Sequence, residues 1–252
     1  MNSDRLRLAL NEKTDVLRSL AQSCPPSQIF FFKGISEYLD DFVARIDAPM
    51  LGDLRITFFH HFIFETPNLP QFISRTPSLK AHNEACVDIS DSGIRLEPVQ
   101  IFARVLKVKL EVPYDEPDWP SPFAQVCRSS FPHAFISSLE NLHIHEDERL
   151  NQREVDTRNA QWLELLHLFT AVKNLYLSEE STPRFARVLQ EIVGERVVEI
   201  LPALQGLFLD EVIPVGPVQE AIGQFVAARQ LSSQPIAVSY WDEEDGWQRV
   251  DD

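Results

Sequence analysis

The sequence predicts an α/β protein in which short helices alternate with strands, and the strands share one apolar pattern. Five segments match the template apolar-x-x-apolar-x-apolar, and the last four begin at 103, 139, 172 and 204, which are 36, 33 and 32 residues apart. The five are Leu51, Leu54, Ile56; Ala103, Leu106, Val108; Leu139, Leu142, Ile144; Val172, Leu175, Leu177; and Leu204, Leu207, Leu209. The main alternative is a doubly wound α/β domain, whose buried strands are nearly continuous apolar runs. Polar or charged residues separate the apolar positions here, which favours an open repeat array, or solenoid.

The template is typical of leucine-rich repeats, in which each strand pairs with the next in a parallel sheet and a helix closes the outer side. We therefore expect an irregular leucine-rich-repeat-like solenoid with a parallel sheet on the concave side and helices on the convex side. The period exceeds the roughly 20 to 29 residues of ordinary repeats. The position that usually holds Asn or Cys holds Asp147, Glu180 and Val212. These departures predict a short, irregular arc.

Helix and strand signals follow one another along the chain and predict a single repeat domain over 1–252. Ser3 and Asp4 are suitable N-caps for a polar helix through about Ala21, so 1–28 is expected to form a helical N-terminal cap. About six helix-strand repeats are expected over 29–241, and 242–252, with six carboxylates, forms an acidic tail. The predicted helices are 36–46, 70–74, 121–128, 159–169, 183–193 and 217–228. The predicted strands are 54–59, 85–89, 99–110, 139–144, 172–177, 204–209 and 236–238.

Composition and charge argue against several classes of protein. With 23 Lys and Arg against 38 Asp and Glu, the net charge is −15, so no surplus of cations is present to bind nucleic acid. The 8 glycines form neither a phosphate-binding loop nor a dinucleotide fingerprint. No uncharged run approaches the roughly 18 residues of a membrane span, so no membrane partner is expected. Cys24, Cys86 and Cys127 are widely separated, as is typical of reduced thiols in the cytoplasm or nucleus.

The candidate partner-binding residues are those that alternate with the core leucines, because successive side chains of a strand point to opposite faces. On the concave face they would be Phe59, Lys107, Lys109, His143, His145, Tyr176, Ser178, Phe208 and Asp210. Large aromatic residues without a role in the core are typical of binding hot spots. The lysines and histidines would also give this face a local charge opposite in sign to the net charge of the chain. The alternative is that a loop covers these residues or that each is singly exposed.

Patterns for catalysis and metal binding are weaker. His143 and His145 would lie on the same side of a strand and are followed by Glu146, but a tetrahedral metal site needs a further ligand from another repeat. Cys127 stands near His133 in the sequence, yet a buried thiol that acts as a small hydrophobe is the favoured interpretation. We therefore expect no catalytic residue, no resident metal and no cofactor.

Several segments resemble the repeat region of the F-box and leucine-rich-repeat-like proteins of mushroom-forming fungi. They are 32–39 (FKGISEYL), 46–49 (IDAP), 72–77 (FISRTP), 161–166 (QWLELL), 193–197 (VGERV) and 216–222 (GPVQEAI). The resemblance implies substrate recognition for a ubiquitin ligase, in which an N-terminal F-box docks on a Skp-type adaptor and the repeats hold the target. Residues 1–23 lack the Leu-Pro-x-Glu start of an F-box. A Skp-type adaptor is therefore expected only if an F-box lies upstream.

Together these observations predict a non-enzymatic protein-protein interaction module that holds a target protein on its concave face. Two alternatives remain open. One is a metal-dependent hydrolase that uses His143 and His145, and the other is a degenerate copy of the family without a partner.

Overall fold

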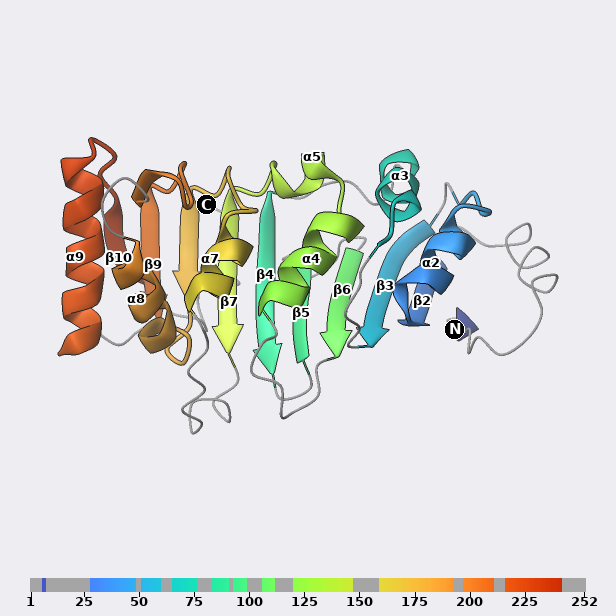
Figure 1. The fold of residues 1–252 in the computed structure, drawn as a ribbon, viewed down its shortest axis with the longest axis horizontal. Coiled ribbons are helices and arrows are strands. Elements are labelled where there is room, and N and C mark those ends of the chain that lie inside the picture. The colour runs from blue at the N-terminus through green and yellow to red at the C-terminus, as the bar shows by residue number, and fades with distance from the viewer. Residues whose placement is uncertain are drawn as a thin grey trace.

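The structure is built on one ten-stranded sheet that runs along the long axis of the molecule (Figure 1). The computed structural model describes residues 6–7, 28–48, 51–59, 65–76, 83–90, 93–98, 106–111, 120–146, 159–192, 197–210 and 216–241. The strands are β1 (Leu6–Arg7), β2 (Gln28–Gly34), β3 (Leu51–Phe59), β4 (Glu84–Ser90), β5 (Gly93–Pro98), β6 (Leu106–Glu111), β7 (Asn141–Glu146), β8 (Asn174–Leu177), β9 (Gly206–Asp210) and β10 (Ala237–Trp241). They lie in the order β1-β2-β3-β6-β5-β4-β7-β8-β9-β10.

Helices cover one face of this sheet. They are α2 (Ser36–Val43), α3 (Asn68–Arg75), α4 (Pro120–Ser130), α5 (His133–Ile136), α7 (Asn159–Leu166), α8 (Thr182–Glu191) and α9 (Pro217–Leu231). Figure 1 shows α2, α4, α7 and α8 lying in front of the strands, with α9 at the end of the sheet beside β10. The protein is therefore α/β, with a largely parallel sheet. No helix among the described residues is both long and apolar enough to cross a lipid bilayer.

The core lies between the helices and the sheet, where the apolar template positions align from strand to strand. Two rows of buried side chains pair in register: Leu142, Leu175 and Leu207 in the first, and Ile144, Leu177 and Leu209 in the second. The residues between them point to the opposite face, because side chains alternate along a strand. The predicted register of these three strands is confirmed.

The same backbone joint recurs just before each C-terminal strand begins. In each joint, one carbonyl accepts hydrogen bonds from two successive amides of the next unit, at 2.7 to 3.0 Å. The acceptors and their donors are Asn83 O with Glu140 and Asn141, Glu140 O with Lys173 and Asn174, and Lys173 O with Gln205 and Gly206. Gln205 O continues the series with the amide of Ala237 at 2.8 Å. These joints fix where each strand starts relative to its neighbour.

The expectation that every strand pairs in parallel with the next one in sequence is wrong in the middle of the chain. β5 is antiparallel to both β4 and β6, and β3 pairs with β6 rather than with β4. Only two residues, 91 and 92, separate β4 from β5. A parallel pair needs a crossover of about a dozen residues or more, so this short link permits only a hairpin.

The N-terminal part of the sheet also differs from the sequence prediction. β2 was expected neither as a helix nor as a strand, and it pairs in parallel with β3. Leu6–Arg7, expected within a helical cap, instead form β1 beside β2. The other residues before Gln28 and the acidic tail at 242–252 lie outside the described residues.

Candidate binding face of the sheet

Three rings are stacked across neighbouring strands on the face of the sheet that lies opposite the helices, and we call this the ring face. His143 of β7, Tyr176 of β8 and Phe208 of β9 pair in register. The centroids of His143 and Tyr176 are 4.2 Å apart with 7° between the ring planes. Those of Tyr176 and Phe208 are 4.5 Å apart with 14° between the planes. Parallel strands lie about 4.8 Å apart, so this spacing lets rings at equivalent positions stack.

A carboxylate fixes one end of the ring stack. Glu84 Oε1 of β4 lies 2.6 Å from Nε2 of His143, whose side chain is nearly buried, with 9% of the residue exposed. Tyr176 and Phe208 are half-buried. Burial, and secondly the negative charge of Glu84, raise the pKa of the Tyr176 hydroxyl, so the phenol stays neutral near pH 7. The stack is thus an aromatic surface of three rings, with a neutral phenol at its centre and a carboxylate beside its β4 end.

A glycine allows the last ring to take its position. Gly206 stands two residues before Phe208 on the same side of β9. A Cβ atom at Gly206 would lie 2.6 Å from Cε2 of Phe208 and 2.9 Å from Oδ1 of Asn174, both closer than such contacts allow. Asn174 in turn donates a hydrogen bond from Nδ2 to Oδ1 of Asn141 at 2.8 Å. The ring of Phe208 therefore lies over Gly206, which has no side chain to obstruct it. It is flanked there by the side-chain amide of Asn174, which is itself held by Asn141.

Basic residues occupy ring-face register positions in the N-terminal part of the sheet. The strand register places Lys107 beside Arg55, and Lys109 beside Thr57. Arg55 lies against Phe31, with its guanidinium carbon 5.2 Å from the ring centroid. The side chains of Lys107 and Lys109, and that of Phe59 on β3, lie outside what the structure describes. On the C-terminal strands β7 to β10, the residues of this face include no Lys or Arg.

The remaining candidate residues take different positions. His145 and Asp210 are half-buried at the ends of β7 and β9. The expectation that Ser178 projects from the ring face is wrong, because β8 ends at Leu177 and Ser178 is only 2% exposed. Its carbonyl accepts hydrogen bonds from the hydroxyl groups of Ser181 and Thr182 at 3.1 and 2.9 Å. Ser178 therefore forms the turn that leads from β8 into α8.

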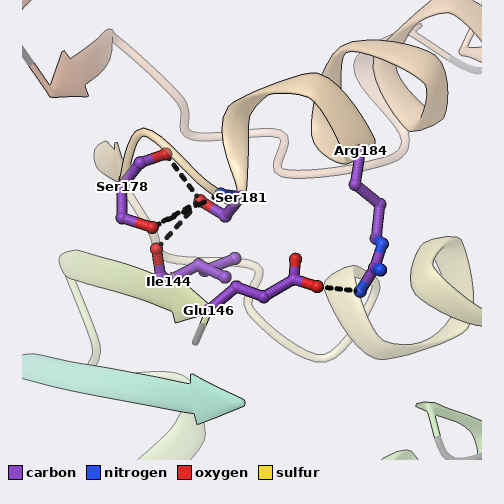
Figure 2. A network of polar contacts seen from close by, with 5 residues as sticks. All are labelled: Ile144, Glu146, Ser178, Ser181 and Arg184. Carbon is purple, nitrogen blue, oxygen red and sulfur yellow. Dashed lines mark hydrogen bonds and ion pairs between the residues drawn. The ribbon is translucent and has the colours of Figure 1, made fainter. Parts of the chain in front are cut away.

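A buried ion pair on the helix side was missed by the sequence interpretation. Glu146 follows Leu142 and Ile144 in the core-facing alternation of β7 and is 1% exposed. Its Oε1 lies 2.6 Å from Nη1 of Arg184 on α8, and Figure 2 shows the two side chains pointing toward each other. A charged residue at a core-facing position of the strand was the signal that could have revealed this pair. Glu146 lies on the opposite face from His143 and His145, so it cannot join them as a metal ligand.

The burial of the Glu146 carboxyl predicts a specific dependence of stability on pH. Burial raises the pKa of Glu146 from its ordinary 4.5 to about 7, although the positive charge of Arg184 acts in the opposite direction. The folded protein therefore holds a proton that the unfolded chain releases above pH 4.5. The stability contributed by the protonated carboxyl is complete below pH 4.5 and is lost as the pH rises to about 7, by an amount on the order of 3 kcal/mol.

We expect the Glu146→Gln variant to lack this loss, because its amide does not titrate. Urea unfolding at several values between pH 5 and pH 8 would measure the free energy of unfolding of both proteins. The wild-type value should fall relative to that of the variant as the pH rises. Parallel curves would contradict the assignment of the raised pKa to Glu146.

Neither pattern for metal binding or thiol catalysis gains support from the geometry. Within the described residues, no three His, Cys, Asp or Glu side chains lie close enough together to hold a metal ion. Cys127 is fully buried in α4, and burial raises the pKa of its thiol well above the ordinary value. A protonated thiol without access to solvent is a poor nucleophile.

Comparisons with known proteins found no relative of this chain. No family model matches it, and neither a curated protein nor a solved structure does.

Proposed function

We propose that this chain is a non-enzymatic protein-binding module and that its partner docks on the ring face. The observation that carries the proposal is the stack of His143, Tyr176 and Phe208, three rings in register on the side of the sheet opposite the helices. The core lies on the other side, so the stack does not serve to hold the helices. Half-buried tyrosine and phenylalanine rings at fixed positions are the kind of group that dominates binding energy at protein interfaces.

We further propose that the fold is an irregular leucine-rich-repeat-like solenoid with the ring face as its concave side. The recurring joints support this proposal, because the acceptor carbonyls of the C-terminal units, those of Glu140, Lys173 and Gln205, follow one another at intervals of 33 and 32 residues. Helices on one side and strands on the other are also what a solenoid requires. In such a fold the concave sheet is an extended surface, which suits a protein partner better than a small molecule.

The resemblance to F-box and leucine-rich-repeat-like proteins narrows the proposal. On that basis the partner is a target protein that is presented for ubiquitin ligation. Docking on a Skp-type adaptor requires an F-box, which residues 1–23 do not supply. An F-box encoded upstream or carried by another chain would complete the complex, and without one the module would bind its target without delivering it.

The proposal is tested by affinity purification and mass spectrometry from cells that express the chain natively. We expect one set of proteins to be recovered with the wild-type chain and lost with the Tyr176→Ala, Phe208→Ala double variant. Each stacked aromatic pair contributes about 1 kcal/mol to stability, so the double variant should remain folded, as circular dichroism would show. A Skp-type adaptor in the recovered set would support the role in ubiquitin ligation.

The matched control carries two alanines outside the ring face. Tyr38 of α2 and Leu231 of α9 are large and exposed, and the Tyr38→Ala, Leu231→Ala variant should recover the same proteins as the wild type. If the ring-face variant also recovers that set, the ring face is not the binding surface. If folded wild-type protein recovers nothing reproducible, the proposal fails and a degenerate copy without a partner is favoured.

A further inference from the structure

Phe208 is the last of the three stacked rings, and the residues that the next strand pairs with Phe208 and Gly206 are small. One face of Phe208 lies against Tyr176, so its other face points away from β8, toward the side of β10. The residues that β10 pairs with Phe208 and Gly206 are Ser239 and Ala237. Ala237 is exposed and Ser239 is half-buried. Neither of these two side chains is large enough to cover a phenyl ring. They therefore leave a position beside Phe208, over Ser239 and Ala237, where a fourth planar group would continue the stack, and we call this position the step.

The charges near the step determine which kind of planar group would bind there. Asp210 follows Phe208 by two residues on the same side of β9, and Glu84 lies at the other end of the stack. The ring-face residues of β7 to β10 include no Lys or Arg that would oppose a positive charge. A cation over an aromatic face is attracted by the ring quadrupole, and a guanidinium group also matches the ring in shape.

We infer that the step beside Phe208 is a binding site for an arginine side chain of the partner. The guanidinium group stacks on the outer face of Phe208, above Ser239 and Ala237, with the carboxylate of Asp210 as the nearby opposite charge. This inference rests on the proposed protein-binding function and adds the chemistry of one contact to it. Lysine fits less well, because its ammonium group is not planar and is more strongly hydrated.

The site can be tested without knowing the partner. The probe is Nα-acetyl-arginine methylamide, titrated into the isotope-labelled full chain while the amide resonances are followed by NMR. We expect saturable shifts at Phe208, Ser239 and Ala237. The lysine and the citrulline analogues of the probe should bind about fivefold more weakly, the first because it is not planar and the second because it has no charge. Equal shifts with all three probes, or shifts elsewhere only, would overturn the inference.

A variant that fills the step provides the sharper control. Ser239→Phe keeps Phe208 in place but adds a ring where the guanidinium would lie, so the arginine-specific shifts should disappear. Ser232→Phe makes the same change at an exposed residue after α9 and should bind the probe like the wild type. Persistent probe binding by the Ser239→Phe variant would contradict the site.

If the probe fails while partner capture still depends on Tyr176 and Phe208, the inference alone is wrong. If the probe binds but capture is independent of these rings, the proposed function is wrong.

Discussion

Replacing Trp162 with alanine is expected to lower the free energy of unfolding by about 3 to 5 kcal/mol, the usual cost of removing a buried tryptophan. Trp162 lies in α7 and is fully buried. Its ring meets that of Phe185 in α8 edge to face, with 4.6 Å between the centroids and 70° between the planes. The variant would lose these contacts and leave a cavity between two successive helices on the same side of the sheet. Urea unfolding followed by circular dichroism measures the loss without relying on tryptophan fluorescence.

Tyr38→Ala is the control for this experiment, because Tyr38 is an exposed aromatic residue of α2. Its free energy of unfolding should stay within about 0.5 kcal/mol of the wild-type value. Trp162→Phe keeps part of the buried surface and should fall between the two. A loss below about 1 kcal/mol for Trp162→Ala would show that this side chain does not fill the core in solution.

The second large effect is expected at Arg229, a fully buried residue of α9. Its guanidinium group donates to the carbonyl of Val197 at 3.0 Å and to that of Leu204 at 2.8 Å. Among the described residues, no carboxylate forms an ion pair with it, and burial lowers its pKa below the ordinary value. The side chain thus ties α9 to both ends of the segment that leads into β9, the strand that carries Phe208.

We expect Arg229→Met to lower the free energy of unfolding by about 2 to 4 kcal/mol. Two buried carbonyls would be left without a hydrogen-bond donor, at a cost of about 1 to 3 kcal/mol each. The variant would also no longer bury an uncompensated positive charge, and this gain would offset part of the cost. Hydrogen exchange should also become faster at the amides of 197–206. Arg187→Met makes the same change at an exposed position of α8 and should have little effect. Unchanged stability of Arg229→Met would mean that the two hydrogen bonds contribute nothing net.

The positions of most helices and strands could be predicted from the sequence, because periodicity and proline signals are local. The expected helix at 121–128 is Pro120–Ser130, and the expected strand at 172–177 is Asn174–Leu177. The pairing of strands could be predicted only where the repeat spacing is regular, from β7 to β9. In the middle of the chain, the choice of β6 as the neighbour of β3 depends on contacts between distant residues, about which a local apolar pattern carries no information.

The ring stack could be predicted in part for the same reason. Nearly equal spacing, of 33 and 32 residues, placed His143, Tyr176 and Phe208 at equivalent strand positions, and the alternation of side chains gave them a common face. Ser178 was misplaced because a rule of alternation holds only as far as the strand extends, and β8 is only four residues long. The hydrogen bond of His143 to Glu84 was beyond prediction, since Glu84 comes from a strand 59 residues earlier in the chain.

The recurring backbone joints also bear on how such a chain can change in length during evolution. The joint between Asn83 and Glu140 spans 57 positions along the chain (83 to 140), whereas the next two joints span 33 and 32 positions (140 to 173, 173 to 205). All three have the same pair of hydrogen bonds, although the longest segment contains β5 and β6. The geometry of a strand start is therefore insensitive to the length of chain between two joints. Insertions between the joints can add whole strands to the sheet while the ring positions that follow keep their register.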